Sequence, residues 1–420
     1  MIQFNQFTLT NGLKVIVHED DTTPLVTVNT LYKVGTRDED PNKTGFAHLF
    51  EHLMFGGSKH IENFDTPLEY AGGENNAFTT NDITNYYITL PANNLETALW
   101  LESDRMLSLD FSQDNLDNQK QVVIEEFKET CINQPYGDLW HHLSALAYKV
   151  HSYQWPTIGK DISHIETANL DDVKQFYSRY YVPNNTVIVI AGGVKTIDVE
   201  RLINKWFADI PAGKQVLRNI PQEPEQKEAR FLEVIADVPV SCFYKTYAMC
   251  RRQDKEYYAT DILSDILGSG DSSRLFQKLV KENKLCSAVN CFVTGSLDAG
   301  LFIIDTKLNE GVNYTEVELV IQSEIDKLIE DGIGTRELQK VKNQIESYSE
   351  YNDLDILNRA TNLAFYEYMG NVNLINDELN SFMEISEEQI KEQAKSLFVK
   401  ERSNTLFYKS SQQNHAEAIK

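Results

Sequence analysis

The sequence predicts an α+β protein of two homologous domains, each a mostly antiparallel sheet with helices packed on one face. Two observations predict this class. Short stretches of strand-like alternation are followed by longer stretches of helical periodicity, which is typical of helices laid across a sheet. The same layout then starts again after a charged, proline-containing stretch. The length of 420 residues suits two or more domains of ordinary size.

The first half begins with predicted strands. Residues 4–9 and 13–17 flank a Thr-Asn-Gly turn, which indicates a β-hairpin, and residues 26–34 continue the alternation. Residues 45–55 change to helical spacing and are followed by two glycines. Residues 186–191 form a short, fully apolar strand. This half is therefore predicted to contain both a sheet and the helices that cover it.

The second half repeats this order. Residues 240–245 resemble the strand at 26–31, and the helical stretch at 260–267 can be laid on 47–54 with its apolar positions in agreement. In that overlay the polar side chains of the first helix fall opposite different ones in the second: His48, Glu51 and His52 opposite Asp261, Ser264 and Asp265. We therefore predict a first domain at 1–212, a linker at 213–229 and a homologous second domain, without the two histidines and the glutamate, at 230–420.

Composition restricts the class of protein. Hydrophobic residues make up 41% and charged residues 24%, and no stretch reaches the roughly 18 apolar residues of a membrane-spanning helix. The N-terminus lacks the basic and apolar regions of a signal peptide, so a cytoplasmic location is expected. The five cysteines have no CxxC spacing, which argues against a disulfide framework and against a cysteine zinc site.

The net charge of −24 disfavours nucleic acid as a partner, because phosphate binding needs a basic surface. If the acidic residues line a cavity, they would favour cationic peptides. A solvated acidic surface that aids solubility is the favoured interpretation of the two.

The chemistry is indicated by one helix, Gly45-Phe46-Ala47-His48-Leu49-Phe50-Glu51-His52-Leu53. Residues four apart share a helix face, so His48 and His52 can bind one ion, with Glu51 close to the same face. Zinc accepts imidazole ligands, and Glu51 can take a proton from an attacking water. The alternative is a surface helix that carries these residues by chance, so the wider sequence has to decide.

The chain resembles the pitrilysin or insulinase-like (M16-type) family of zinc peptidases, which includes the mitochondrial processing peptidase. That resemblance implies a third ligand within a Val-Val-x-x-Glu pattern, about 75 residues after the second histidine. The sequence has Val122-Val123-Ile124-Glu125-Glu126. The register makes Glu126 the ligand, with Glu125 as the nearest rival and Glu129 as a second-shell acid. One departure is Gln119, where many relatives carry an acid.

A second stretch, Gly72-Gly73-Glu74-Asn75-Asn76-Ala77-Phe78-Thr79-Thr80, resembles the family's strand beside the zinc. The resemblance implies that substrate pairs there as an added β-strand and that Asn76, Ala77 and Phe78 line the cleft. Taken alone, the stretch is a Gly/Asn-rich turn before an ordinary strand. Residues 133–137 and 155–159 also stand where relatives carry similar residues.

The family completes its site with an Arg and a Tyr that follow a Ser-Ser-Arg-Leu stretch. Here Ser272-Ser273-Arg274-Leu275 is present, but Val280 and Ser287 occupy the Arg and Tyr positions. Lys281 or Lys284 could substitute, or the register could differ by one. At face value the loss implies a heterodimer with a homologous subunit that lacks HxxEH and supplies Arg and Tyr. A homodimer is the second choice.

The sequence thus predicts a zinc-dependent endopeptidase, with Zn2+ held by His48, His52 and Glu126 and water activated by Glu51. The alternative is a catalytically silent scaffold or regulatory subunit of the same fold, although such a subunit has no need of the four residues. A nucleotide site at Gly268-Ser269-Gly270-Asp271-Ser272-Ser273 is rejected, because the stretch has no GK[ST] ending and a helix end explains it.

Overall fold

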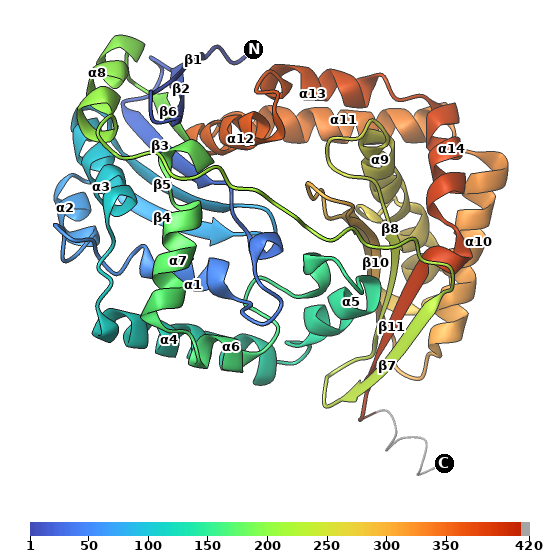
Figure 1. Cartoon of the computed structure of the whole chain (residues 1–420). Coiled ribbons are helices and arrows are strands. Elements are labelled where there is room, and N and C mark those ends of the chain that lie inside the picture. Colours follow the sequence, from blue (N-terminus) through green and yellow to red (C-terminus); the bar gives the residue numbers. More distant parts are fainter. Residues whose placement is uncertain (413–420) are drawn as a thin grey trace. The chain divides into compact units, whose positions relative to one another are not determined.

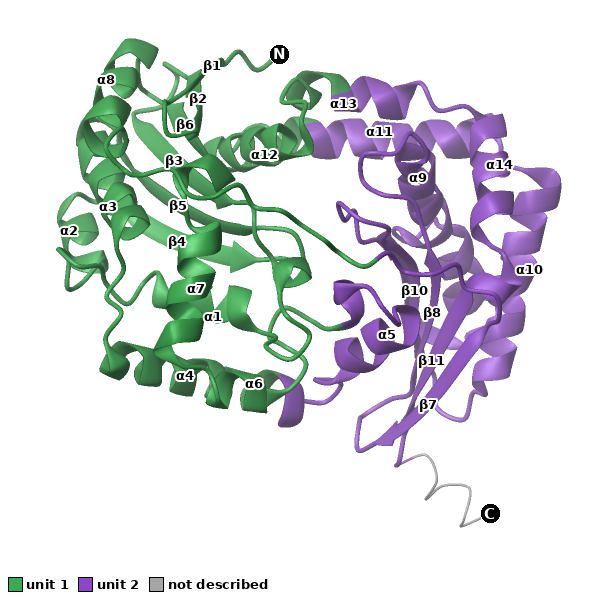
Figure 2. Cartoon of the chain, viewed as in Figure 1, with its two compact units in different colours: residues 1–130, 155–221, 350–377 green, residues 131–154, 222–349, 378–420 purple. Residues whose placement is uncertain are grey.

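The computed structural model describes residues 1–412, which form two compact units (Figures 1 and 2). Each unit is assembled from three stretches of the chain. Unit 1 contains residues 1–130, 155–221 and 350–377, and unit 2 contains residues 131–154, 222–349 and those from 378 onward.

The sheet of unit 1 has six strands in the order β1-β2-β6-β3-β5-β4. The pairing of β2 with β6 is parallel and the other pairings are antiparallel. The predicted hairpin is formed by β1 and β2, and β4 is an edge strand with one neighbour. The strand bounds are β1 Asn5–Thr8, β2 Lys14–Glu19, β3 Leu25–Tyr32, β4 Glu74–Thr79, β5 Thr84–Pro91 and β6 Thr186–Gly192.

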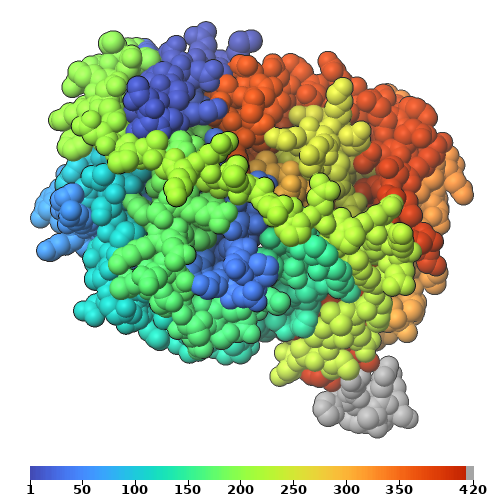
Figure 3. Space-filling view, viewed as in Figure 1, coloured from blue at the N-terminus to red at the C-terminus, as the bar shows by residue number. Residues whose placement is uncertain are grey.

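Helices lie on both faces of this sheet. One face packs into a core shared with α1 (Phe46–Leu53) and α3 (Leu95–Leu107). The other face packs against α12 (Ile356–Met369), which contacts β6 and β3. The remaining helices of unit 1 are α2 Asp65–Tyr70, α4 Gln113–Phe127, α6 Ile162–Glu166, α7 Leu170–Tyr180 and α8 Thr196–Phe207, with 3-10 turns at Thr36–Asp38, Ala92–Asn94 and Pro183–Asn185. A π-helical turn, Lys128–Ile132, follows α4 at the boundary of the unit. Figure 3 shows the first strands (blue) beside α8 (light green) on the surface of this unit.

The sheet of unit 2 has five strands in the order β7-β11-β8-β10-β9, with β7 and β11 parallel. The bounds are β7 Arg230–Ala236, β8 Cys242–Ala248, β9 Cys286–Val293, β10 Leu301–Leu308 and β11 Ser403–Ser410. One face packs against α9 (Glu256–Gly268), and α5 (Leu139–Ala147) contacts β11, β7 and β8 on the other. The other helices of unit 2 are a π-helix Phe276–Glu282, α10 Tyr314–Asp331 and α14 Glu387–Leu397, with 3-10 turns at Ser152–Gln154 and Lys400–Arg402. Helices α11 Thr335–Asn352 and α13 Leu374–Met383 belong mostly to unit 2 and end or begin in unit 1.

The predicted α+β class with two sheets is confirmed, but the units are not continuous halves of the chain. Helix α5 belongs to unit 2 and α12 belongs to unit 1, which differs from a simple division at 212 and 230. The reason is that both faces of each sheet are apolar. In β2, for example, Val15 and Val17 are buried on the α1 side and Ile16 is buried under α12. Helices packed on one face would leave the second face in water.

The predicted linker at 213–229 forms neither helix nor strand, and the change from unit 1 to unit 2 falls within it, after Pro221. Within residues 1–412, no helix is both long enough and apolar enough to cross a membrane.

Candidate metal centre

Helix α1 turns its apolar residues inward and its motif outward. Phe46, Leu49, Phe50 and Leu53 are buried in the core of unit 1, whereas the three motif residues are half-buried on the remaining face. The histidines lie one helical turn apart, as their spacing predicts. The amphipathic pattern of the helix therefore fixes the direction in which the imidazoles point.

A buried carboxylate holds the start of α1. The Oε1 atom of Glu39 accepts a hydrogen bond from the Ala47 amide at 2.8 Å, and its Oε2 accepts from the Gly45 amide at 3.0 Å. The indole Nε1–H of Trp155 donates to the same Oε2 at 3.0 Å. Burial raises the pKa of Glu39 to about 8, although the three N–H donors act in the opposite direction. Glu39 thus satisfies amides that would otherwise be unpaired at the helix start.

The stretch at 155–159 packs directly on the same helix start. Gly45 has a φ of +84°, in the left-handed region, and a Cβ there would lie 2.8 Å from the carbonyl oxygen of Ile158. Only glycine fits both restrictions. The stretch at 155–159, which resembles the family, therefore has a structural role: it packs against the start of the helix that carries the motif.

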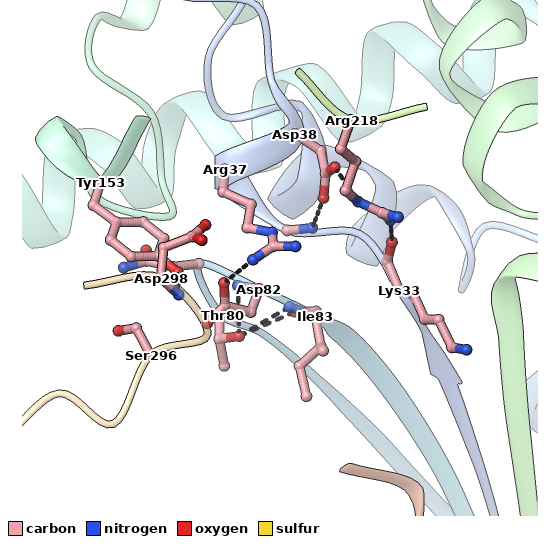
Figure 4. A network of polar contacts seen from close by, with 12 residues as sticks. Lys33, Arg37, Asp38, Thr80, Asp82, Ile83, Tyr153, Arg218, Ser296 and Asp298 are labelled. Atoms are coloured by element: carbon pink, nitrogen blue, oxygen red, sulfur yellow. Dashed lines mark hydrogen bonds and ion pairs between the residues drawn. The ribbon is translucent and has the colours of Figure 1, made fainter. Parts of the chain in front are cut away.

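A polar network fixes the loop that carries Glu39 (Figure 4). Asp38 accepts a hydrogen bond from Arg218 Nε at 2.8 Å, and the side chains of Arg37 and Asp82 form an ion pair at 3.4 Å. The amide of Arg37 also donates to the carbonyl of Asn81 at 2.9 Å. The loop before α1 is thereby joined to the turn between β4 and β5.

Three donor atoms from α1 and α4 converge on one point. His48 Nε2 lies 3.3 Å from His52 Nε2 and 3.7 Å from the Oε2 of Glu126, which is 3.3 Å from His52 Nε2. Among the described His, Cys, Asp and Glu side chains, this is the group of three that could hold a metal ion. Tetrahedral zinc bonds of about 2.0–2.1 Å separate neighbouring ligand atoms by about 3.3 Å. The donor set therefore fits zinc in both chemistry and spacing.

The ionisation of these groups also suits a cation. Burial lowers the pKa of His48, against the attraction of Glu126, and the hydrogen bond with His52 lowers the pKa of Glu126. Metals bind neutral imidazole and ionised carboxylate, which are the forms that these shifts favour.

Glu51 lies outside this group of three. Its Oε2 accepts a hydrogen bond from the Thr79 hydroxyl on β4 at 2.6 Å. The carboxylate is half-buried, so it is neither sequestered in the core nor free in solvent. Its expected role as the base stays a prediction.

The structure distinguishes among the acids of α4. Glu125 is exposed and pairs with Lys128 at 2.8 Å, so it is not the carboxylate beside the histidines. Glu129 is exposed in the π-helical turn that follows α4, and it is not a member of the candidate metal group. Its second-shell role stays a prediction.

The predicted substrate residues lie on edge strand β4 but not on one face of it. Ala77 packs against the core that contains α1, whereas Phe78 packs against the cluster that contains α12. Asn76 is exposed, and strand alternation places it on the Phe78 side. Only the backbone edge of β4 is common to all three, so their predicted part in binding rests on main-chain pairing.

The corresponding helix of unit 2 carries different chemistry. Asp261, Ser264 and Asp265 lie on α9, as the overlay predicted. Burial raises the pKa of Asp261 to about 7, and the charge of Asp265 adds to this effect. Val280 packs against the core of unit 2 and Ser287 is exposed on β9, so neither replaces an Arg or a Tyr. The subunit that would supply them stays a prediction.

Sequence reasoning missed two residues, Glu39 and Thr79. Glu39 stands in a run of polar residues that reads as a surface loop, and only its place ahead of a glycine-started helix hints at a capping role. Thr79 was part of the predicted strand, but its contact with Glu51 depends on how β4 and α1 pack.

Comparisons with known proteins place the whole chain in one family. The model described as insulinase (peptidase family M16) matches residues 14–161, and the one described as peptidase M16 inactive domain matches residues 167–345. The chain is 31% identical to the zinc protease PqqE of Helicobacter pylori over 412 residues, covering 96% of this chain and 92% of that protein. It is 24% identical over 359 residues to the probable mitochondrial-processing peptidase subunit beta of Arabidopsis thaliana, covering 81% and 66%.

Among solved structures, the crystal structure of a protease from Helicobacter pylori superposes with a TM-score of 0.93 at 30% identity. The match covers 97% of this chain and 100% of that one. The family models, the relatives and the fold therefore agree, and the chain belongs to peptidase family M16, the insulinase family.

Proposed function

We propose that the chain is a zinc-dependent endopeptidase. The observation that carries the proposal is the convergence of His48, His52 and Glu126 within 3.3–3.7 Å, with Glu51 held separately beside them. A structural zinc site is normally closed by four protein ligands, whereas three ligands leave a position for water or substrate.

When bound, zinc would act as a Lewis acid and lower the pKa of a water molecule to about 7. The half-buried carboxylate of Glu51 would take a proton from the attacking water and later give it to the leaving amine nitrogen. The two histidines and Glu126 would contribute two neutral ligands and one anionic ligand. Oε1 of Glu51 is left for proton transfer, because the hydrogen bond from Thr79 uses Oε2.

The substrate is proposed to bind in extended form along β4. This strand is the edge of its sheet and pairs only with β5, so one side of its backbone is available for another strand. Main-chain pairing gives affinity with little regard for side chains, which fits an endopeptidase that accepts varied peptides. The proposal includes a cleft that encloses the bound peptide. It also includes a preference for basic peptides, which the net charge of −24 favours.

A homologous subunit remains part of the proposal. Val280 has no hydrogen-bond donor in its side chain, and the hydroxyl of Ser287 stands on a side chain far shorter than that of Tyr, so a partner chain would have to supply the Arg and the Tyr. The relative from Arabidopsis thaliana is named as a subunit, which supports a heterodimer over a homodimer. The alternative, a silent scaffold of this fold, is favoured by the match of the second half to a model described as inactive, but that match does not include α1.

The test is hydrolysis of a quenched fluorescent peptide library by the purified chain, with zinc measured on the same sample. We expect cleavage that chelation abolishes, and that Glu51→Gln lowers by about 10²–10⁴-fold with zinc retained. Ser264→Ala, at the matching position of α9, is the control and should cleave normally. Equal cleavage by Glu51→Gln and the unaltered chain would refute the proposed mechanism, and zinc binding without cleavage by the chain alone would favour the heterodimer.

A further inference from the structure

We propose that Thr79 is a positioning residue that orients the carboxylate of Glu51. The inference rests on the proposed function and adds a residue to that site. Its basis is the hydrogen bond of 2.6 Å from the Thr79 hydroxyl to Glu51 Oε2, a short and therefore strong contact between a hydroxyl and a carboxylate.

The geometry gives the hydroxyl no competing role. Thr79 is the last residue of β4, and its backbone is fixed by pairing with Thr84 on β5. A threonine in a strand has few accessible rotamers, so the hydroxyl is held in place by the sheet. The carboxylate, by contrast, stands on a long side chain on the half-buried face of α1. The stiffer group therefore fixes the more mobile one.

The consequence is a division of labour between the two carboxylate oxygens. Because Oε2 accepts the hydrogen bond of the Thr79 hydroxyl, the lone pairs of Oε1 stay available to a water molecule. An unrestrained Glu51 could also turn toward the histidine pair one residue and three residues away, where it would compete with Glu126. Thr79 thus keeps the base distinct from the ligands.

The same contact joins the base to the strand on which substrate is proposed to bind. Ala77 and Thr79 lie on the same side of β4 by strand alternation, and Ala77 packs against the core shared with α1. Thr79 would therefore set the position of Glu51 relative to a peptide that pairs with the edge of β4. Both substrate and base would take their position from the same strand.

The first test compares Thr79→Val, which keeps the shape and loses the hydroxyl, with Thr79→Ser, which keeps the hydroxyl. We expect Thr79→Val to lower kcat by about 10–100-fold, with KM and zinc content unchanged, and Thr79→Ser to restore most of the rate. Thr89→Val removes a hydroxyl that pairs with Thr27 instead, and it should leave kcat unaltered. Equal rates for Thr79→Val and the unaltered chain, or equal losses for both Thr79 variants, would overturn the proposal.

The second test does not depend on activity. Thr79→Val is made in the unaltered chain and in Glu51→Ala, and Tm is measured for all four proteins. We expect the Tm change caused by Thr79→Val to disappear once Glu51 is absent, because the two residues act as a pair. The same Tm change in both backgrounds would overturn the role of Thr79 even if peptides are cleaved. Absence of cleavage by every variant, combined with coupling in Tm, would instead refute the proposed function and leave the contact established.

Discussion

Helix α1 contacts the edge strand β4 of its sheet and helix α9 contacts the edge strand β9 of its own, but the two helices differ in their polar residues. On α1, two histidines meet a carboxylate from α4, with donor atoms 3.3–3.7 Å apart. On α9, Asp261 and Asp265 stand at the same spacing, and burial raises the pKa of both. The same kind of helix thus presents a candidate cation site in one unit and a pair of half-buried acids in the other. The difference teaches that the helix fixes where groups point, while a few side chains decide what they bind.

The largest expected effect separates Glu126 from its neighbour. Glu126→Gln should lose zinc on dialysis and lose hydrolysis with it, because the ion then has two protein ligands and no anionic one. Glu125→Gln should keep both, since that side chain is exposed and paired with Lys128. Zinc content by elemental analysis decides the matter. Retention of zinc by Glu126→Gln together with its loss from Glu125→Gln would reverse the assignment.

The next effect concerns the support of α1. Glu39→Ala should lower the free energy of unfolding by about 3 kcal/mol or more, since each buried donor left unsatisfied costs about 1–3 kcal/mol. Three donors lose their acceptor: the amides of Gly45 and Ala47 and the indole of Trp155. Denaturant titration measures the change, and Asp40→Ala, at the exposed neighbouring position, should change stability little. A loss of the same size in both variants would mean that the helix start does not depend on Glu39.

A smaller effect is expected in the second unit. The pKa of Asp261 is raised to about 7, so the folded state holds a proton that the unfolded chain releases near pH 4. Stability from this group is therefore present at low pH and is lost as pH rises through about 7. Asp261→Asn should match the unaltered chain in Tm near pH 4 and exceed it at pH 8 by at least about 2–4 °C. With Asp271→Asn, at an exposed site, the difference should stay flat, and a flat difference for Asp261→Asn as well would contradict the buried-acid interpretation.

The smallest effect is an expected absence of change. Asp261→His combined with Asp265→His gives α9 the histidine pair of α1, yet we expect zinc to remain at one ion per chain. The positive charge of Arg252 acts on position 261 and that of Lys340 on position 265, and both would oppose a bound cation. The carboxylate of Glu378 is already paired with Arg252 and is therefore not available as a third ligand. A second zinc in this double variant would show that histidine spacing alone makes the site.

The sequence was sufficient to predict the parts of the site that depend on local spacing. His48 and His52 share a face because an α-helix repeats every 3.6 residues, so a separation of four residues is enough to predict that their side chains are neighbours. Glu126 could be assigned only through family resemblance, since its approach depends on how α4 packs on α1. Glu39 and Thr79 were missed because their contacts depend on how the chain folds around α1: Glu39 also binds the distant Trp155, and Thr79 reaches Glu51 from another element.

The sequence also did not predict that α5 belongs to unit 2 and α12 to unit 1. The apolar stripe of α12 indicates that the helix is buried, but the stripe does not specify which sheet it covers. The fully apolar strand at 186–191 was a partial clue, because a strand apolar on both faces needs cover on both. For β4, the family resemblance predicted the strand, yet it did not reveal that Ala77 and Phe78 pack into different clusters.

The central claim is that unit 1 holds one catalytic zinc and unit 2 holds none. X-ray absorption at the zinc edge, together with zinc stoichiometry on the unaltered chain, tests it most directly. The account predicts one zinc per chain, with nitrogen and oxygen neighbours at about 2.0–2.1 Å, two of them imidazole, and no sulfur. Two zinc ions per chain, a sulfur neighbour at about 2.3 Å, or a site that persists in His48→Ala together with His52→Ala would contradict it.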